Sequence, residues 1–186
     1  MVVVTRNFGT EVILAKEIEV GDGPSAMEAL KRVADVKTAY GEGFVVDING
    51  VKSGHTEGES ADWFFYVNGI LANTGALGYN LRGGDIEQWD FHDWSFHAFI
   101  PAIIGHFPEP FRHGYRGNIC PTIVVYDEGL GETAQALADR LKGLGVKDVF
   151  VQNVKGLSQE SKKQSNIILL GTANHELISE LNRIYG

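Results

Sequence analysis

The chain has 186 residues, of which 44% are hydrophobic and 22% are charged, a composition typical of a globular protein. Its net charge of −8 lies wholly in residues 1–96, which hold seven Lys/Arg and fifteen Asp/Glu. Such an acidic half argues against binding to nucleic acid or to an anionic membrane surface, because both partners require a basic footprint.

Two absences narrow the class of protein further. A single cysteine, Cys120, excludes an internal disulfide and a multi-cysteine zinc site. No apolar run approaches the roughly 20 residues that span a bilayer, and no signal peptide is visible. We therefore expect no membrane-spanning segment, while a removed signal or an anchor elsewhere in the native chain stays open.

Residues 1–96 read, in chain order, as two strands, a helix and further strands. β-Branched residues mark "MVVVTRNF" and "EVILAKEIEV" as a hairpin. In "GDGPSAMEALKRVADV" either Asp22 or Ser25 can cap a helix. "GFVVDING" is a strand that ends in a turn, "VKSGHTEGES" is a polar loop, and "DWFFYVNG" and "DIEQWDFHDW" are the last strands. A sheet of this order crossed by one helix predicts an α+β domain of the β-grasp type.

Residues 97–118 break the periodicity and form a connector with three prolines. Because this segment is too apolar for a loose linker, we expect it to pack against the domains on both sides. Its large apolar residues are candidates to cover the sheet: Phe99, Ile100, Ile103, Ile104, Phe107 and Phe111.

Residues 119–186 alternate between strands and helices. "PTIVVYDEG", "VKDVFVQNV" and "SNIILLG" are strand patterns, and "GETAQALADRLKGLG" and "NHELISELNRIYG" are helix patterns. This alternation predicts a small three-layer α/β domain with a parallel sheet. The domain is short for this class, so a truncated domain is one interpretation.

A motif spread over the two aromatic strands resembles a known family. It consists of Trp63, Tyr66, Val67, Asn68 and Gly69, followed by Gly84, Asp85, Ile86 and Trp89. Residues 1–94 thereby resemble the β-grasp domain named for the C-terminal domain of transcobalamin and intrinsic factor. The second half resembles only generic flavodoxin-like or Rossmann-like units.

The resemblance implies a β-grasp fold first, and only secondarily a ligand. In the vertebrate carriers this domain closes over one face of the corrin ring, opposite a helical barrel that this chain lacks, so cobalamin or another corrinoid is an implied ligand. Prokaryotic relatives often occur in exported or lipid-anchored surface proteins, which implies an extracytoplasmic or cell-surface location.

Aromatic residues occupy both faces of the predicted strands. Trp63 and Phe65 share one face of their strand, and Phe64 and Tyr66 share the other. Only one face can contact the helix, so the other needs cover from the connector, the second domain or a ligand. If a ligand binds, the expected residues are Trp63, Tyr66, Asn68, Asn73, Tyr79, Trp89 and Trp94. Asn68-Gly69 should form a tight turn with positive φ at Gly69.

Metal and catalytic sites have weaker signals. His92, His97, His106 and His113 follow no metal-binding spacing, so we expect solvated or core histidines and no metal site. Cys120 has no predicted helix N-terminus to activate it, and no nucleophile-elbow motif occurs. No catalytic residue is therefore assigned.

Together these patterns predict a non-enzymatic, extracytoplasmic module that binds a small ligand, with a corrinoid as the implied example. A surface-attachment or protein–protein interaction module is the first alternative. An enzyme that uses the strand ends near Asp127 and Gly171 is the second.

Overall fold

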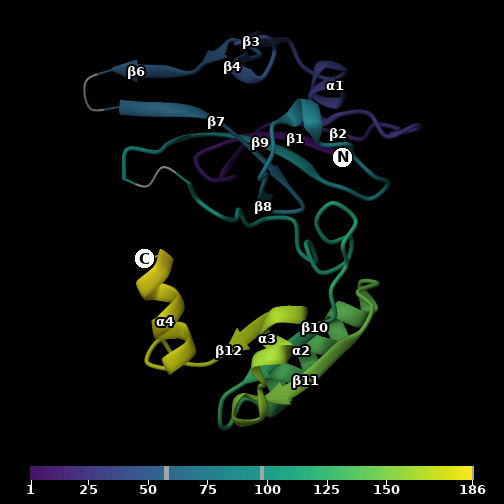
Figure 1. The fold of residues 1–186 in the computed structure, drawn as a ribbon, viewed down its shortest axis with the longest axis vertical. Helices are drawn as coiled ribbons and strands as arrows, with labels where there is room; N and C mark the ends of the chain where they lie inside the picture. The colour runs from purple at the N-terminus through teal and green to yellow at the C-terminus, as the bar shows by residue number, and fades with distance from the viewer. Residues whose placement is uncertain (57–58, 97–98, 186) are drawn as a thin grey trace. The chain divides into compact units, whose positions relative to one another are not determined.

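The structure is a computed structural model that describes residues 1–56, 59–96 and 99–185. The chain divides into two compact units, residues 1–118 and 119–186 (Figure 1). The connector residues 99–118 thus belong to the first unit. None of the helices in the described ranges is long and apolar enough to cross a membrane.

The first unit is built on a mixed sheet with the order β2-β1-β9-β7-β6, to which β8 adds beside β7. β1 pairs antiparallel with β2 and parallel with β9, and β9 pairs antiparallel with β7. This parallel pairing of the first strand with the last is the β-grasp arrangement seen in Figure 1. The strands are β1 (Val2–Arg6), β2 (Glu11–Lys16), β6 (Gly54–Thr56), β7 (Glu59–Val67), β8 (Ile70–Leu71) and β9 (Glu87–Asp93).

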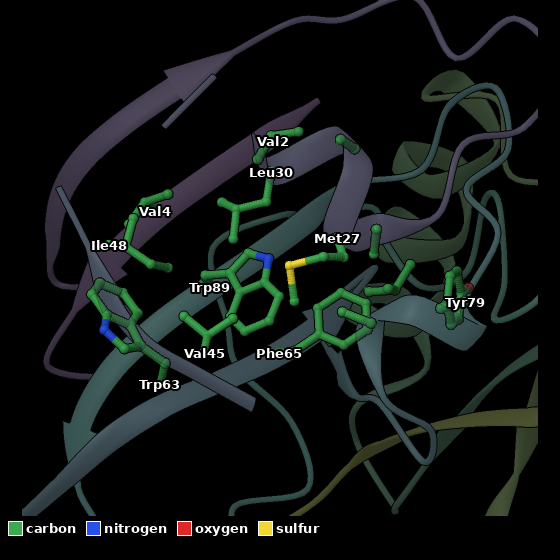
Figure 2. Packing of buried hydrophobic residues seen from close by; sticks show 14 of the residues in the cluster. Val2, Val4, Met27, Leu30, Val45, Ile48, Trp63, Phe65, Tyr79 and Trp89 are labelled. Atoms are coloured by element: carbon green, nitrogen blue, oxygen red, sulfur yellow. The ribbon is translucent and has the colours of Figure 1, made fainter. Parts of the chain in front are cut away.

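A single helix, α1 (Ala26–Lys31), crosses one face of this sheet. Ser25 rather than Asp22 caps it: the Ser25 hydroxyl accepts the Glu28 N–H at 3.2 Å, and the Glu28 carboxylate accepts the Ser25 N–H at 2.8 Å. The apolar side of α1 packs on Val2, Val4, Phe65 and Trp89 (Figure 2).

A second, small antiparallel sheet has the order β3-β4-β5, with β3 (Val36–Ala39), β4 (Phe44–Ile48) and β5 (Val51–Lys52). β5 and β6 lie in the segment that the sequence predicted as a polar loop, so that prediction was wrong. Strands pair through hydrogen bonds between backbone N–H and C=O groups, and a polar side chain that faces water does not prevent such pairing. A 3₁₀ helix, η1 (Ala76–Gly78), follows β8.

The connector lies against the face of the first sheet that α1 leaves open. Ile103 N–H donates to the Gly69 carbonyl at 2.9 Å, and Leu71 N–H donates to the Pro101 carbonyl at 3.0 Å. Of its six large apolar residues only Ile103 is buried, whereas Phe99, Ile104 and Phe107 are exposed. The covered face is itself largely polar, so hydrogen bonds contribute much of the cover that apolar side chains were expected to supply.

The second unit is a three-stranded parallel sheet, β11-β10-β12, with apolar central strand β10. α2 packs on β10 and β11 through Ala134, Ala138 and Leu141. The connection through α2 and the connection through α3 run in opposite directions along the sheet. The elements are β10 (Thr122–Tyr126), α2 (Gly131–Gly143), β11 (Val149–Asn153), η2 (Val154–Gly156), α3 (Gln159–Gln164), β12 (Asn166–Leu170) and α4 (Glu176–Tyr185). The predicted fold class, α+β with a β-grasp unit followed by a small α/β unit, is confirmed.

The turn between β7 and β8 fixes both the hairpin and the connector. Asn68 and Gly69 have φ values of 52° and 79°, which confirms the predicted tight turn with positive φ at Gly69. A Cβ at Gly69 would lie 2.9 Å from the Ile103 carbonyl oxygen. Gly50 has a similar φ of 87° but nothing within 4 Å of its Cβ position, so it is a matched control.

We expect Gly69→Ala to lower the free energy of unfolding by about 1 kcal/mol or more beyond the loss in Gly50→Ala. Both variants incur the cost of a left-handed alanine, about 1–2 kcal/mol, and only Gly69→Ala also overpacks the connector. Urea unfolding followed by tryptophan fluorescence reports on this unit, because all three tryptophans lie within it. Equal losses in the two variants would show that the connector is not held against the turn.

Candidate functional site

A pocket of about 470 Å³ opens at the outer edge of β7. Its walls come from β7, from the beginning of β4, from the segment that runs from β8 into η1, and from the residues after β9. The lining residues are Gly43, Phe44, Val45, Asp62, Trp63, Phe64, Phe65, Leu71, Ala72, Thr74, Gly75, Ala76, Trp89, Trp94 and Phe99.

The pocket exists because β7 lacks a strand partner over part of its outer edge. β6 pairs with β7 only as far as Ala61, and β8 pairs with it only from Tyr66. Among the described residues no strand pairs with the outer edge of β7 between these two positions, while β9 pairs with its inner edge throughout. Backbone groups alternate in direction along an antiparallel strand, and the Phe65 carbonyl already faces outward to accept the Ala72 N–H. The backbone N–H and C=O of Trp63 therefore point toward the same open edge.

Aromatic rings dominate the lining, and all three tryptophans of the chain take part. Trp63 and Trp89 are nearly buried, while Trp94 is half-buried and Phe99 is exposed. Phe65 stacks on Trp89 with ring centroids 5.1 Å apart. Figure 2 shows these two rings and Trp63 among the buried residues of the hydrophobic core. A ligand in this pocket would meet rings that the core already holds in place.

The polar atoms of these tryptophans are already bound within the protein. The indole N–H of Trp63 donates to the Val51 carbonyl at 3.1 Å. Trp94 Nε1 donates to an Asp62 carboxylate oxygen at 2.8 Å, and Trp89 Nε1 donates to a Glu87 carboxylate oxygen at 2.7 Å. What remains for a ligand is the faces and edges of the rings, so the pocket is suited to stacking.

The structure brings three of the seven expected ligand-binding residues to this pocket: Trp63, Trp89 and Trp94. The other four lie outside its lining. Asn73 is exposed and accepts a hydrogen bond from the Tyr115 hydroxyl at 2.9 Å.

The remaining three, Tyr66, Asn68 and Tyr79, are buried and hold the fold together. The Tyr66 hydroxyl donates to the Ile100 carbonyl at 3.2 Å, and burial raises its pKa. The Tyr79 hydroxyl accepts the Arg116 N–H at 3.0 Å, and burial raises its pKa to about 12.

Asn68 uses its whole side-chain amide internally. Its carbonyl accepts the Ile86 N–H at 2.8 Å, and its NH₂ donates to Asp85 at 2.9 Å and to the Gly114 carbonyl at 2.7 Å. Asn68 therefore ties the β7–β8 turn to the beginning of β9 and to the connector. These bonds explain its place in the aromatic motif without a ligand.

Sequence reasoning missed several lining residues, above all Phe44, Asp62 and Phe64. Alternation along β7 places Phe64 on the face opposite Trp63, and nothing in the sequence shows where β6 and β8 stop pairing. The row of aromatic residues at 63–66 was the available signal, because it puts rings on both sides of one strand edge.

The face of the sheet under the connector is organised by the buried carboxylate of Asp90. It accepts hydrogen bonds from the Thr5 hydroxyl at 2.5 Å, the Phe8 and Gly9 N–H groups at 2.9 and 2.8 Å, and His92 Nδ1 at 2.8 Å. Burial raises the pKa of Asp90, but these hydrogen bonds outweigh burial and hold the pKa below its ordinary value.

His92 connects this carboxylate to the wall of the pocket. Its ring stacks on Phe64, with ring centroids 4.2 Å apart and planes inclined by 12°. The centroid of the Phe8 ring lies 4.3 Å from that of His92. Because Phe64 lines the pocket, the Asp90 network fixes one of the pocket's rings.

The other expected histidines do not gather at one point. His106 Nε2 lies 2.7 Å from Gln88 Oε1, and His113 Nδ1 lies 2.6 Å from Glu109 Oε1. His97 lies outside the described residues. Burial lowers the pKa of His106. Within the described ranges no three His, Cys, Asp or Glu side chains are placed to hold a metal ion.

The strand ends of the second unit form local contacts. Asp127 follows β10, and its carboxylate accepts the N–H of the adjacent Glu128 at 2.8 Å. His175 Nδ1 accepts the Leu177 N–H at 3.2 Å at the beginning of α4. These are helix-capping and turn contacts, and they single out no catalytic group.

One family model matches part of the first unit. A family described as "Domain of unknown function (DUF4430)" matches residues 23–93. The match runs from just before α1 to the end of β9 and includes every residue of the pocket lining except Trp94 and Phe99. No curated protein and no solved structure matches the chain.

Glu87 makes the stability of this unit depend on pH. It is fully buried on the α1 face of the sheet, and burial raises its pKa to about 8 from the ordinary 4.5. The folded protein therefore keeps a proton that the unfolded chain releases. The contribution of protonated Glu87 to the free energy of unfolding is fully present below about pH 4.5 and is lost as pH rises through about 8.

We expect Glu87→Gln to remove this pH dependence, because an amide cannot ionise and still accepts the Trp89 N–H. The free energy of unfolding of the variant relative to the original protein should rise between pH 5 and 8, by on the order of 3 kcal/mol. Glu11→Gln, at an exposed position on β2, serves as the control. Parallel stability curves for Glu87→Gln and the original protein would mean that Glu87 is ionised in the folded state.

Proposed function

We propose that the first unit is a non-enzymatic binding module that holds a flat, largely apolar small ligand in the pocket beside β7. The observation that carries this proposal is the pocket itself, about 470 Å³ in volume and lined by all three tryptophans of the chain. Pockets that bury small ligands range from about 300 to 1,000 Å³ and are mostly apolar and aromatic.

The pattern of hydrogen bonds favours a ring-shaped ligand. The three indole N–H groups are bound within the protein, so the pocket offers ring faces more than donors. Aromatic pairs with offset-stacked geometry contribute roughly 0.5–1.5 kcal/mol each beyond the area they bury. Asp62 and Thr74 add polar atoms to the lining, which would orient polar groups on the ligand.

A corrinoid is the ligand that the resemblance to the transcobalamin family supports. The DUF4430 match covers the whole motif from Trp63 to Trp89. A complete corrinoid is larger than this pocket, so one edge of the ring would enter and the remainder would stay in water. We therefore expect weak affinity, micromolar or weaker, about −8 kcal/mol at best.

The same resemblance supports an extracytoplasmic or cell-surface location for the native protein. A module that captures a scarce ligand outside the cell gains from a wide, exposed mouth, and Phe44 and Phe99 at this pocket are exposed. Detection of the native protein only inside intact, protease-treated host cells would contradict this location.

A role in attachment to another protein is a second candidate, favoured by a different observation. Phe96, Phe99, Ile104 and Phe107, in and beside the connector, are 66%, 67%, 88% and 53% exposed. These residues lie within twelve positions of the sequence, and large exposed apolar residues that form a patch mark many protein interaction sites. The ligand titration separates the two candidates, because attachment through the connector requires no small molecule.

The direct test is titration with cobinamide and cobalamin, followed by tryptophan fluorescence corrected for absorption by the corrin. We expect a saturable change. Phe99→Ala should weaken binding about fivefold, the equivalent of roughly 1 kcal/mol of lost stacking. Phe107→Ala is the matched control, because Phe107 is also an exposed phenylalanine of the connector and lies outside the pocket.

Two outcomes would contradict the proposal. Absence of a saturable change up to about millimolar ligand would exclude corrinoids as the ligand. Equal weakening by Phe99→Ala and Phe107→Ala would place binding on the connector surface and would favour attachment to a protein partner.

A further inference from the structure

A second cleft, of about 180 Å³, lies beside the end of η1 and shares no lining residue with the aromatic pocket. Gly78, Tyr79, Asn80, Arg82 and Arg116 line it. The loop before β9 supplies Arg82, and the end of the connector supplies Arg116. Segments that are 34 positions apart in the sequence thus bring two arginines to the lining of one small cleft.

Backbone contacts at the end of the connector position residues of both segments at the cleft. Arg116 has a φ of 54° and its N–H donates to the Tyr79 hydroxyl at 3.0 Å, which fixes the loop against the core. The next residue, Gly117, has a φ of 73°, and a Cβ there would lie 1.5 Å from Nη1 of Arg82. The Arg82 guanidinium therefore rests directly on the Gly117 backbone, in space that only glycine leaves open.

The charges in the cleft are not balanced by the protein. No acidic residue lines it, and in the part of the chain that the structure describes neither arginine forms an ion pair. Asp85 is nearby but buried, and its carboxylate accepts the Arg82 backbone N–H at 2.9 Å and the Asn68 amide at 2.9 Å. Both arginines are exposed, and an anion that pairs with both would reduce the repulsion between their like charges.

This arrangement is unexpected in a unit whose first 96 residues carry a net charge of −8. The net charge of this region attracts cations, so a cleft lined by two arginines and by no acidic residue differs from its surroundings in charge. Guanidinium groups match the geometry of phosphate and carboxylate oxygens and bind them through paired hydrogen bonds. A volume of about 180 Å³ accommodates one such group with its water.

We propose that Arg82 and Arg116 form an anion-binding site that takes a phosphate group in its doubly charged form. Two fixed positive charges favour a dianion over a monoanion such as acetate, because each guanidinium can pair with a separate negative oxygen. The site is independent of the aromatic pocket, so the failure of either proposal leaves the other unaffected.

The test is titration of the whole chain with inorganic phosphate at low, constant ionic strength, followed by calorimetry. We expect saturable binding in the millimolar range, equivalent to about −4 kcal/mol. Arg82→Gln and Arg116→Gln should each weaken it at least about fivefold. Arg112→Gln is the matched control, because Arg112 is an exposed arginine of the connector outside the cleft, and it should leave binding unchanged.

Two further arms identify the anion and guard against misfolding. Binding should weaken from about pH 7.5 to pH 5.5, as phosphate loses its second charge, and acetate should bind more weakly than phosphate at pH 7.5. Circular dichroism checks the fold of each variant, and Arg82→Lys, which keeps the charge but loses the planar fork, replaces Arg82→Gln if that variant unfolds.

Three results would overturn the proposal. They are no saturation up to about 10 mM phosphate, equal weakening in Arg82→Gln, Arg116→Gln and Arg112→Gln, and acetate binding as tight as phosphate binding.

Discussion

The first unit depends on the burial of both faces of its central strands. On the face that the connector covers, the buried carboxylate of Asp90 organises the hydrogen bonds. α1 covers the apolar face, where Val2, Val4, Phe65 and Trp89 form the core. On the opposite face, Asp90 is fully buried and accepts four hydrogen bonds, two of them from the backbone of the β1–β2 turn. A buried charge is tolerated only when it is paired in this way. Because the Asp90 carboxylate is paired in this way, the polar face of the sheet can be buried under the connector.

The candidate site lies where strand pairing along the outer edge of β7 is interrupted. Rings from both faces of β7, such as Trp63 and Phe64, meet at the one stretch of its outer edge that neither β6 nor β8 pairs with. The core fixes the first ring, and the Asp90–His92 pair fixes the second. A site whose walls are positioned by buried contacts loses little entropy when it binds, and such preorganisation is what a rigid, flat ligand requires.

Much of the fold could be predicted from short-range patterns. Alternation along β7 placed Trp63 and Phe65 on one face and Phe64 and Tyr66 on the other, and the strand pairing confirms this. The turn at Gly69 and the cap at Ser25 follow from local backbone chemistry. The roles of Asn68, Tyr66 and Tyr79 could not be predicted, because their partners Gly114, Ile100 and Arg116 come from the irregular connector. The pocket likewise depends on where β6 and β8 end, and the alternation of apolar and polar residues in the sequence does not predict these positions.

The central claim is that the unpaired edge of β7 is a ligand site, and the most direct measurement is the nitrogen-15 NMR spectrum of the indole N–H groups during addition of cobinamide. The chain has three tryptophans, and all three line the pocket, so each indole signal reports on it. We expect the Trp94 signal to shift most, because Trp94 is the least buried of the three, and the Trp63 and Trp89 signals to shift with the same dissociation constant. Binding that leaves all three indole signals in place would contradict the central claim.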